Sequence, residues 1–411
     1  MLISRIELEN LLSFQSLDLE LRPLNVVVGA NASGKSNLIR SLDLVRALPK
    51  RELGRVMAEG GGPRFWINRR STGVARIHLE GTPDLPFDYS LSFQEAGQSW
   101  AIIREEYKGV FERDQDQAIL GVFRDPVPSS HISFPGFRYH REKAPHGQVF
   151  NSSDEVPTEP GWVDSPNKFG MQTSVPLTAS VLSEIRHPNA IALTKLATAL
   201  ESICLYREFR TGPGAQARTG TASSLLADSL LEDGGNLALR LNELNFHDGL
   251  KRINAVLRRF FELSSEVVVL TKGGITQLYL RETGVKDAFA ATSLSDGTLR
   301  LLCLLAVLLD ANPPPLICIE EPEIGLHPDA IREIAGLLTD ASTRAQLIVT
   351  THSPTLIDAL GDQPEAVLVC ERDFDRFTQF RRLDRPELDE WLERYTLGEL
   401  WQKGEIGGNR W

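Results

Sequence analysis

The sequence lacks the features that would mark a membrane, disulfide-stabilised or zinc-dependent protein. No apolar run reaches the roughly 18 residues that a membrane-spanning helix needs, and the first residues show no signal-peptide pattern. The four cysteines are scattered and form no C-x-x-C pair, so neither a zinc site nor a disulfide framework is indicated. The H-E-x-x-H motif of zinc enzymes and the G-x-S-x-G motif of serine nucleophiles are also missing. We therefore expect a cytoplasmic protein without a membrane part.

Positive charge is also in short supply. The chain has 55 acidic and 44 basic residues, a net charge of -11 at pH 7, and such a field repels nucleic acid. The arginines form local clusters that we interpret as solvated faces, because no aromatic residues are interleaved with them. These clusters are Arg64, Arg69 and Arg70; Arg252, Arg258 and Arg259; and Arg376, Arg381, Arg382 and Arg385. Contact with DNA stays open.

One glycine-framed turn carries the strongest signal in the chain. The stretch G-A-N-A-S-G-K-S fits the phosphate-binding pattern G-x-x-x-x-G-K-[ST], between an apolar run at 23–28 and a helical pattern from Asn37. Its glycines let successive backbone N–H groups point inward, Lys35 reaches the outer phosphates, and Ser36 ligates magnesium. The predicted nucleotide-binding residues are Gly29, Ala30, Asn31, Ala32, Ser33, Gly34, Lys35, Ser36 and Asn37.

The order of elements predicts a split domain. Strands are expected at 2–8, 14–21, 24–28, 75–79, 87–93, 100–103 and 118–123, the later ones forming an antiparallel sheet. Residues 125–170 read as irregular, and 179–206 as helical with an interruption at Pro188. Strands then return at 267–270, 276–280, 316–319 and 347–349. We expect an α/β fold, a mixed sheet flanked by helices with an antiparallel β subdomain, built from residues 1–123 and 264–411 around a helical or irregular insertion at 124–263.

A pair of carboxylates follows the apolar run at 316–319. At the mouth of a buried strand, Glu320 is placed to hold magnesium and Glu321 to polarise an attacking water as general base. The alternative is a pair of exposed charges at a strand end.

Two further segments could contact phosphate. Ser295 and Gly297 precede the apolar helix at 298–309, where small residues at a helix N-terminus either bind an anion or simply cap the helix. His352 ends the strand at 347–349 and could sense a terminal phosphate, with Gly325-Leu-His327-Pro328 expected nearby. Taken singly, a histidine in such a place is more often structural than functional.

In this order, the motifs resemble those of ABC-type P-loop ATPases. L-S-D-G-T stands where that family has its L-S-G-G-Q signature, and E-E-P-E-x-G-L-H-P and T-T-H-S-P resemble the branch that includes the SMC, RecF and OLD ATPase heads. The resemblance covers about residues 1–123 and 264–411. It implies ATP and Mg²⁺ as cofactors, and a head-to-tail homodimer in which Ser295 and Gly297 of one copy contact the γ-phosphate held by Lys35 of the other.

The sequence departs from that family at three places. Glu320 replaces the usual aspartate, and Asp296 replaces a signature glycine, so that its carboxylate must turn outward or weaken dimer closure. No glutamine of the expected Q-loop is evident, although Gln94 and Gln98 follow a strand. The segment after His352 is too short for the nuclease domain of OLD proteins, so we expect any nuclease activity to belong to a separate partner.

Three functions remain open on this evidence. The first is an ATP-gated homodimeric switch acting on DNA or on a separate effector protein, in DNA maintenance or phage defence. The second is the ATPase subunit of a membrane transporter, which shares most motifs. The third is a nucleotide-dependent binding module with little hydrolysis.

Overall fold

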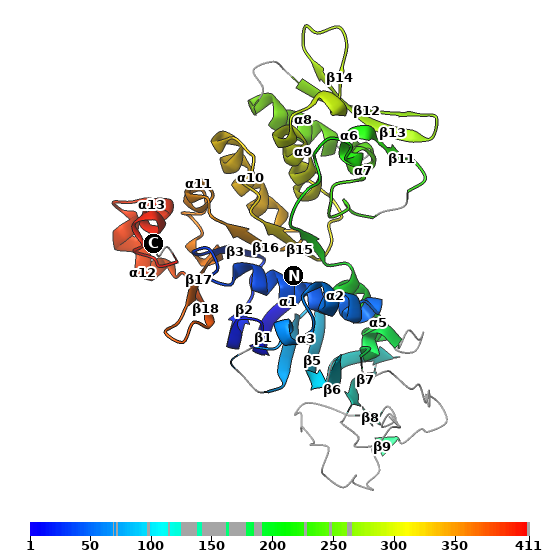
Figure 1. Cartoon of the computed structure of the whole chain (residues 1–411), viewed down its shortest axis with the longest axis vertical. Helices are drawn as coiled ribbons and strands as arrows, with labels where there is room; N and C mark the ends of the chain where they lie inside the picture. The colour runs from blue at the N-terminus through cyan, green and yellow to red at the C-terminus, as the bar shows by residue number, and fades with distance from the viewer. Residues whose placement is uncertain are drawn as a thin grey trace. The chain divides into compact units, whose positions relative to one another are not determined.

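The computed structural model describes residues 1–68, 70, 73–96, 99–113, 116–124, 138–141, 162–163, 178–184, 191–225, 228–245, 249–260 and 265–408 (Figure 1). The chain divides into two compact units. Unit 1 comprises Met1, Arg22–Ile39 and Ile203–Trp411, and unit 2 comprises Leu2–Leu21 and Arg40–Ser202. Among the described residues, none of the helices is long and apolar enough to cross a membrane.

Unit 1 is built on a six-stranded sheet whose first five strands are parallel. The order is β10 (Cys204–Tyr206), β15 (Leu316–Glu320), β16 (Gln346–Thr351), β3 (Leu24–Val28), β17 (Val367–Arg372) and β18 (Thr378–Arg382), with only β18 antiparallel to its neighbour. β3 and β16 are buried along their whole length, as parallel strands covered on both faces require. The registers Val28↔Thr351 and Glu320↔Thr350 bring the carboxyl ends of three strands to one edge.

Helices and a smaller sheet complete unit 1. α9 (Asp296–Leu308) is apolar nearly all round and buried, and it contacts α7 (Leu237–Leu244), α8 (Gly249–Phe260) and α10 (Pro328–Ala341). α7 and α8 also pack on an antiparallel sheet of β11 (Thr221–Ala222), β13 (Ile275–Glu282), β12 (Ser265–Lys272) and β14 (Phe289–Ala290). The remaining elements are α6 (Gln216–Thr219), η3 (Ala291–Ser293), α11 (Pro354–Asp358), η4 (Pro364–Ala366), α12 (Arg385–Leu392) and α13 (Leu397–Lys403). The helix α1 (Lys35–Ala47) begins in unit 1 and continues into unit 2 from Arg40.

Unit 2 contains the antiparallel sheet predicted for the strands between 75 and 123. The order of this sheet is β2 (Phe14–Glu20), β1 (Ile3–Leu11), β4 (Ala75–Thr82), β5 (Leu85–Ala96), β6 (Ser99–Arg113), β7 (Asp116–Arg124), β8 (Arg138–Arg141) and β9 (Trp162–Val163). The predicted part is thus extended by β1 and β2 at one side and by β8 and β9 at the other. β8 and β9 lie within 125–170, so the prediction of irregular structure was wrong for these two short strands. Alternate residues of β4 are buried, which is the pattern of a sheet with one covered face. The helices of this unit are η1 (Leu48–Lys50), α2 (Leu53–Glu59), α3 (Pro63–Trp66), α4 (Val181–Glu184) and α5 (Ile191–Glu201).

The segment 179–206 was predicted to be helical to its end, but its last three residues form a strand. α4 and α5 are helical, but Cys204–Tyr206 is the strand β10, paired with β15. The prediction of helix there was wrong, because pairing with a strand more than a hundred residues away overrides a local pattern. β10, α7 and α8 all lie in unit 1, although the sequence assigned them to the insertion. The boundaries proposed at 124 and 263 stay a prediction, and most of 125–170 lies outside the described residues.

Candidate functional site

The predicted phosphate loop joins β3 to α1 and is held by the far end of the chain. Ala32 (φ 61°) and Gly34 (φ 119°) adopt positive backbone angles, and a Cβ on Gly34 would lie 2.1 Å from the hydroxyl oxygen of Thr378. That hydroxyl donates a 2.7 Å hydrogen bond to the carbonyl of Ser33. The Ser33 hydroxyl donates to the sulfur of Cys370 at 3.3 Å, and burial raises the pKa of that thiol to about 11. β17 and β18 therefore pack against the loop and support it through Cys370 and Thr378. Only glycine fits at position 34, because any Cβ there would collide with Thr378.

Lys35 is the first residue of α1 and turns back onto the loop. Its Nζ donates to the carbonyls of Gly29 at 2.8 Å and Ala30 at 3.1 Å, and the residue is only 6% exposed. Burial lowers the pKa of Lys35, while nearby acidic groups that include Glu321 and Glu320 oppose that shift. The Lys35 ammonium is thus hydrogen-bonded to two backbone carbonyl oxygens, and a phosphate oxygen could take their place as acceptor.

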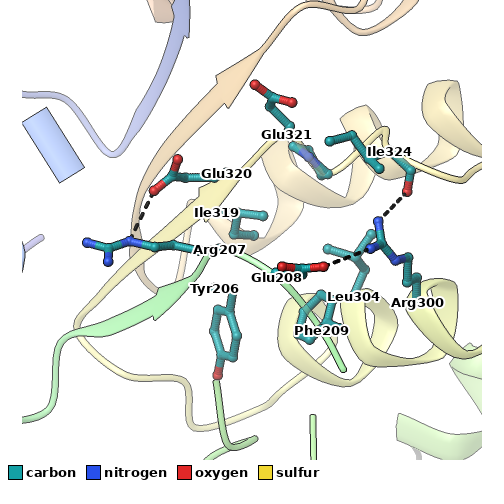
Figure 2. Close-up of a pocket in the computed structure, with 11 residues that line it drawn as sticks. Tyr206, Arg207, Glu208, Phe209, Arg300, Leu304, Ile319, Glu320, Glu321 and Ile324 are labelled. Atoms are coloured by element: carbon teal, nitrogen blue, oxygen red, sulfur yellow. Dashed lines mark hydrogen bonds and ion pairs between the residues drawn. The ribbon is translucent and has the colours of Figure 1, made fainter. Parts of the chain in front are cut away.

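Ser36 and Glu320 meet at the place where a metal is expected. The Ser36 hydroxyl donates to Glu320 Oε2 at 3.1 Å, joining α1 to the end of β15. Hydroxyl and carboxylate oxygens are hard ligands of the kind that Mg²⁺ prefers, so the donor set fits that ion. The second carboxylate oxygen, Glu320 Oε1, lies 3.1 Å from Arg207 Nε, as Figure 2 shows. Arg207 was not predicted as a site residue, because the strand that positions it, Cys204–Tyr206, was predicted as helix.

Glu321 is held in a backbone conformation that is rare for its type. Its φ is 47°, and its N–H donates to the carbonyl of Thr350 at 2.9 Å, which fixes the turn at the end of β15. The Glu321 carboxylate lies 3.7 Å from His352 Nε2. Burial, and then the charge of Lys35, lower the pKa of His352 although Glu321 opposes them, so the imidazole is largely uncharged at neutral pH. The structure thus brings together both residues predicted to be catalytic.

A third carboxylate, Glu323, ties this turn to the end of β16. Its Oε1 accepts 2.8 Å and 2.7 Å hydrogen bonds from the Thr351 hydroxyl and the His352 N–H. Its Oε2 is buried without a hydrogen-bond partner, and burial raises the pKa of the group. Glu323 was not among the predicted site residues, because no local sequence pattern indicates that its side chain reaches the neighbouring strand β16.

The segment around Ser295 and Gly297 forms the N-terminus of α9. Ser295 caps the helix, its Oγ accepting from the Thr298 N–H at 3.1 Å, as the capping interpretation predicted. A Cβ on Gly297 would lie 2.6 Å from the carbonyl oxygen of Gly325, so the glycine permits close approach of the G-L-H-P turn. In that turn, His327 is exposed and caps α10 by accepting from the Asp329 N–H at 3.3 Å.

Arg218 holds the segment that leads to this helix end. Its Nη1 donates to the carbonyls of Leu294 at 2.6 Å and Ala291 at 3.2 Å, and at 3.3 Å to that of Thr292. Its Nη2 binds the Asp296 carboxylate at 2.6 Å, and its Nε donates to the carbonyl of Thr211. The carboxylate that departs from the family signature is therefore neutralised within the chain, while remaining 62% exposed.

A cavity of about 230 Å³ adjoins the Glu320 and Glu321 end of β15 (Figure 2). Arg207 lies on one side of Glu320, while Arg300 binds the carbonyl of Ile324 at 3.2 Å and approaches Glu208 at 3.9 Å. The other lining residues are Tyr206, Phe209, Leu304, Ile319 and Pro322. The cavity thus combines an apolar wall with fixed charges beside the proposed metal ligands.

Other candidate residues lie outside this group. Gln94 is exposed in β5 of unit 2, and Gln98 lies outside the described residues. Unit 2 also holds Glu7, His78 and Glu80 close enough to share a metal ion. Arg5 and His78 already pair with these carboxylates, so we interpret the cluster as an ion-pair network.

Comparison with known proteins gives one family match and one similarity to a curated protein. The model of a family described as "AAA domain, putative AbiEii toxin, Type IV TA system" matches residues 24–120 and 230–358, more than half of the chain. A stretch of 126 residues is 31% identical to the energy-coupling factor transporter ATP-binding protein EcfA2 of Lactobacillus delbrueckii subsp. bulgaricus. That alignment takes in 29% of this chain and 42% of the relative, so the chain spans less than half of the relative's length.

Solved structures with a similar trace include SMC head domains. The SmcHead bound to the C-winged helix domain of ScpA is 13% identical, with coverage of 94% of this chain and 99% of that chain and a TM-score of 0.48. The SMC head domain from Thermotoga maritima is 13% identical, with coverage of 93% and 100% and a TM-score of 0.41.

Proposed function

Because the chain belongs to the AAA-domain family of P-loop ATPases whose description includes the putative AbiEii toxin, we propose that it binds ATP with Mg²⁺, hydrolyses it, and uses the nucleotide to join two copies of itself. The single observation that carries this proposal is the 3.1 Å hydrogen bond from Ser36 to Glu320. It joins the phosphate loop to the strand end that carries Glu321, as hydrolysis of a bound triphosphate requires.

Each residue then has a distinct part. The loop N–H groups of residues 29–37 and the Lys35 ammonium would bind the phosphates, and Ser36 with Glu320 would hold Mg²⁺. Bound there, the ion would supply charge neutralisation at the phosphate oxygens. Glu321 accepts the proton of the attacking water, and His352, uncharged at neutral pH, donates a hydrogen bond near the terminal phosphate.

The second copy supplies Ser295 and Gly297. Ser295 caps α9 and Asp296 pairs with Arg218. In the proposed dimer, the positive end of this helix would meet the phosphate held by the other copy. Arg218 resolves the conflict raised by Asp296, because its guanidinium offsets a carboxylate that would otherwise repel the γ-phosphate. We propose that the closed homodimer acts in the cytoplasm on DNA or on a separate effector, in DNA maintenance or phage defence.

The transporter alternative was raised because such ATPases share most of the motifs, and the similarity to EcfA2 adds to it over only 126 residues. The family match covers more of the chain and carries no transporter description. We therefore favour the ATP-gated switch.

The test is the size of the Glu321→Gln protein, measured by light scattering after gel filtration with and without ATP and Mg²⁺. We expect a dimer only with both, because slowed hydrolysis preserves the nucleotide that joins the copies. Lys35→Ala, which removes the phosphate contact, is the control and should stay monomeric. A Glu321→Gln protein of unchanged size would refute the switch. Turnover left unchanged by Glu321→Gln would support the nucleotide-dependent binding module with little hydrolysis.

A further inference from the structure

We propose that Arg207 is a positioning residue that fixes the carboxylate of Glu320 for the metal; this inference rests on the proposed function. The two oxygens of Glu320 are divided between two partners. Oε2 accepts from Ser36 at 3.1 Å, and Oε1 faces Arg207 Nε at the same distance. The arginine therefore takes the oxygen that is not directed at the metal ligand Ser36.

The longer side chain explains why such a residue is needed. Glutamate has one more rotatable bond than the aspartate usual in this family, so its carboxylate can occupy more positions about the strand end. A fixed guanidinium restricts that freedom, because a charge-assisted hydrogen bond orients the carboxylate plane. Outer partners that orient a metal-binding group in this way are a general feature of metal sites.

The backbone of Arg207 is well anchored. β10 pairs in parallel with β15, and the register Tyr206↔Ile319 places Arg207 beside Glu320. Tyr206 is buried, and its hydroxyl donates to the carbonyl of Leu230 at 2.9 Å. The N–H of Leu205 donates to Glu232 at 2.8 Å. The arginine thus extends from a rigid strand end rather than from a loose loop.

The charge of Arg207 could also act in the opposite direction. A cation beside Glu320 competes with the metal for negative charge, so its removal would then tighten metal binding. The Arg207 side chain is 42% exposed, and water screens such competition strongly. We therefore expect the loss of orientation to outweigh the relief of competition.

The experiment measures the Mg²⁺ concentration that half-saturates binding of a fluorescent, non-hydrolysable ATP analogue to the full chain. Arg207→Ala should raise that concentration about tenfold, the usual scale for losing an outer-shell partner. Arg207→Lys should give a smaller rise, because lysine keeps the charge but not the planar fork. Arg252→Ala is the matched control, since Arg252 is also half-exposed and pairs with a carboxylate, Asp340, away from the site.

A double-mutant cycle separates orientation from general damage. In a Glu320→Asp background the carboxylate withdraws from Arg207, so Arg207→Ala should there change the half-saturating Mg²⁺ less than twofold. An equal effect in both backgrounds, no effect, or tighter Mg²⁺ binding by Arg207→Ala would overturn the inference. If the unaltered protein showed no Mg²⁺-dependent binding of the analogue, the proposed function itself would fail, and this inference with it.

Discussion

Removing the Arg218 side chain should loosen the segment 291–296 that leads into α9. Arg218→Ala deletes the donors to the carbonyls of Ala291 and Leu294, both partly buried, and the exposed pair with Asp296. Hydrogen bonds from a charged donor contribute about 1.5–3 kcal/mol each, and the two carbonyls can partly rehydrate. We therefore expect a loss of about 2–4 kcal/mol in the local stability of the segment.

Asp296→Ala is the matched perturbation from the other side of the pair. It removes only a pair whose carboxylate is 62% exposed, so it should cost less than about 1 kcal/mol. A chain with two compact units can unfold in more than one step, so a single unfolding free energy would not report on this segment. The suitable assay is therefore hydrogen exchange, measured by mass spectrometry on peptides covering 291–299. If the two variants differed by less than about 0.5 kcal/mol, the carbonyl contacts would not hold the segment and our reasoning would be wrong.

Three other perturbations test separate parts of the structure. Gly34→Ala should abolish nucleotide binding, because the added Cβ would collide with Thr378. It should also lower the unfolding free energy measured in urea by at least about 1–3 kcal/mol. Gly54→Ala is the control and should be neutral or stabilising, because the space around Gly54 is open. Hydrogen bonding to Asp88, and secondarily to Glu7, raises the pKa of His78 against the effect of burial. The protonated imidazole therefore stabilises unit 2 fully below the unfolded value near 6.5, and this contribution is lost as pH rises through the folded value. Urea titrations across this range should show a shallower pH dependence for His78→Ala. Glu323→Ala should lower ATP turnover roughly tenfold or more by releasing His352, while Glu323→Gln, which keeps an acceptor oxygen, should retain most activity; equal losses would contradict a positioning role.

The parts of the site that are contiguous in sequence were predictable. The phosphate loop and the Glu320-Glu321 pair each occupy one strand end, and a local pattern carries both the strand and the residues that follow it. The predicted α/β fold, with a mixed sheet and an antiparallel subdomain, is confirmed by the two units. Recognition as a P-loop ATPase of the ABC type is confirmed by the family match.

The residues that sequence reasoning missed are defined by pairing between distant segments. Arg207 is positioned by the pairing of β10 with β15, and Arg218 by its hydrogen bonds to the loop before α9. The residues next to either arginine in sequence give no sign of these distant partners. β10 was predicted as helix for the same reason, since three residues carry too little periodicity to oppose a helical neighbourhood. Contacts of this kind arise from tertiary packing, which a local pattern does not encode.

The hydrogen bond between Thr378 and Ser33 spans 345 residues of sequence. During synthesis Ser33 leaves the ribosome long before Thr378, so the phosphate loop of the nascent chain at first lacks the contacts with β17 and β18. Its affinity for triphosphate should appear only when the last strands emerge and settle into place. Any nucleotide-dependent activity would therefore wait until β18 has been synthesised, and a product that stops before Thr378 would bind nucleotide poorly.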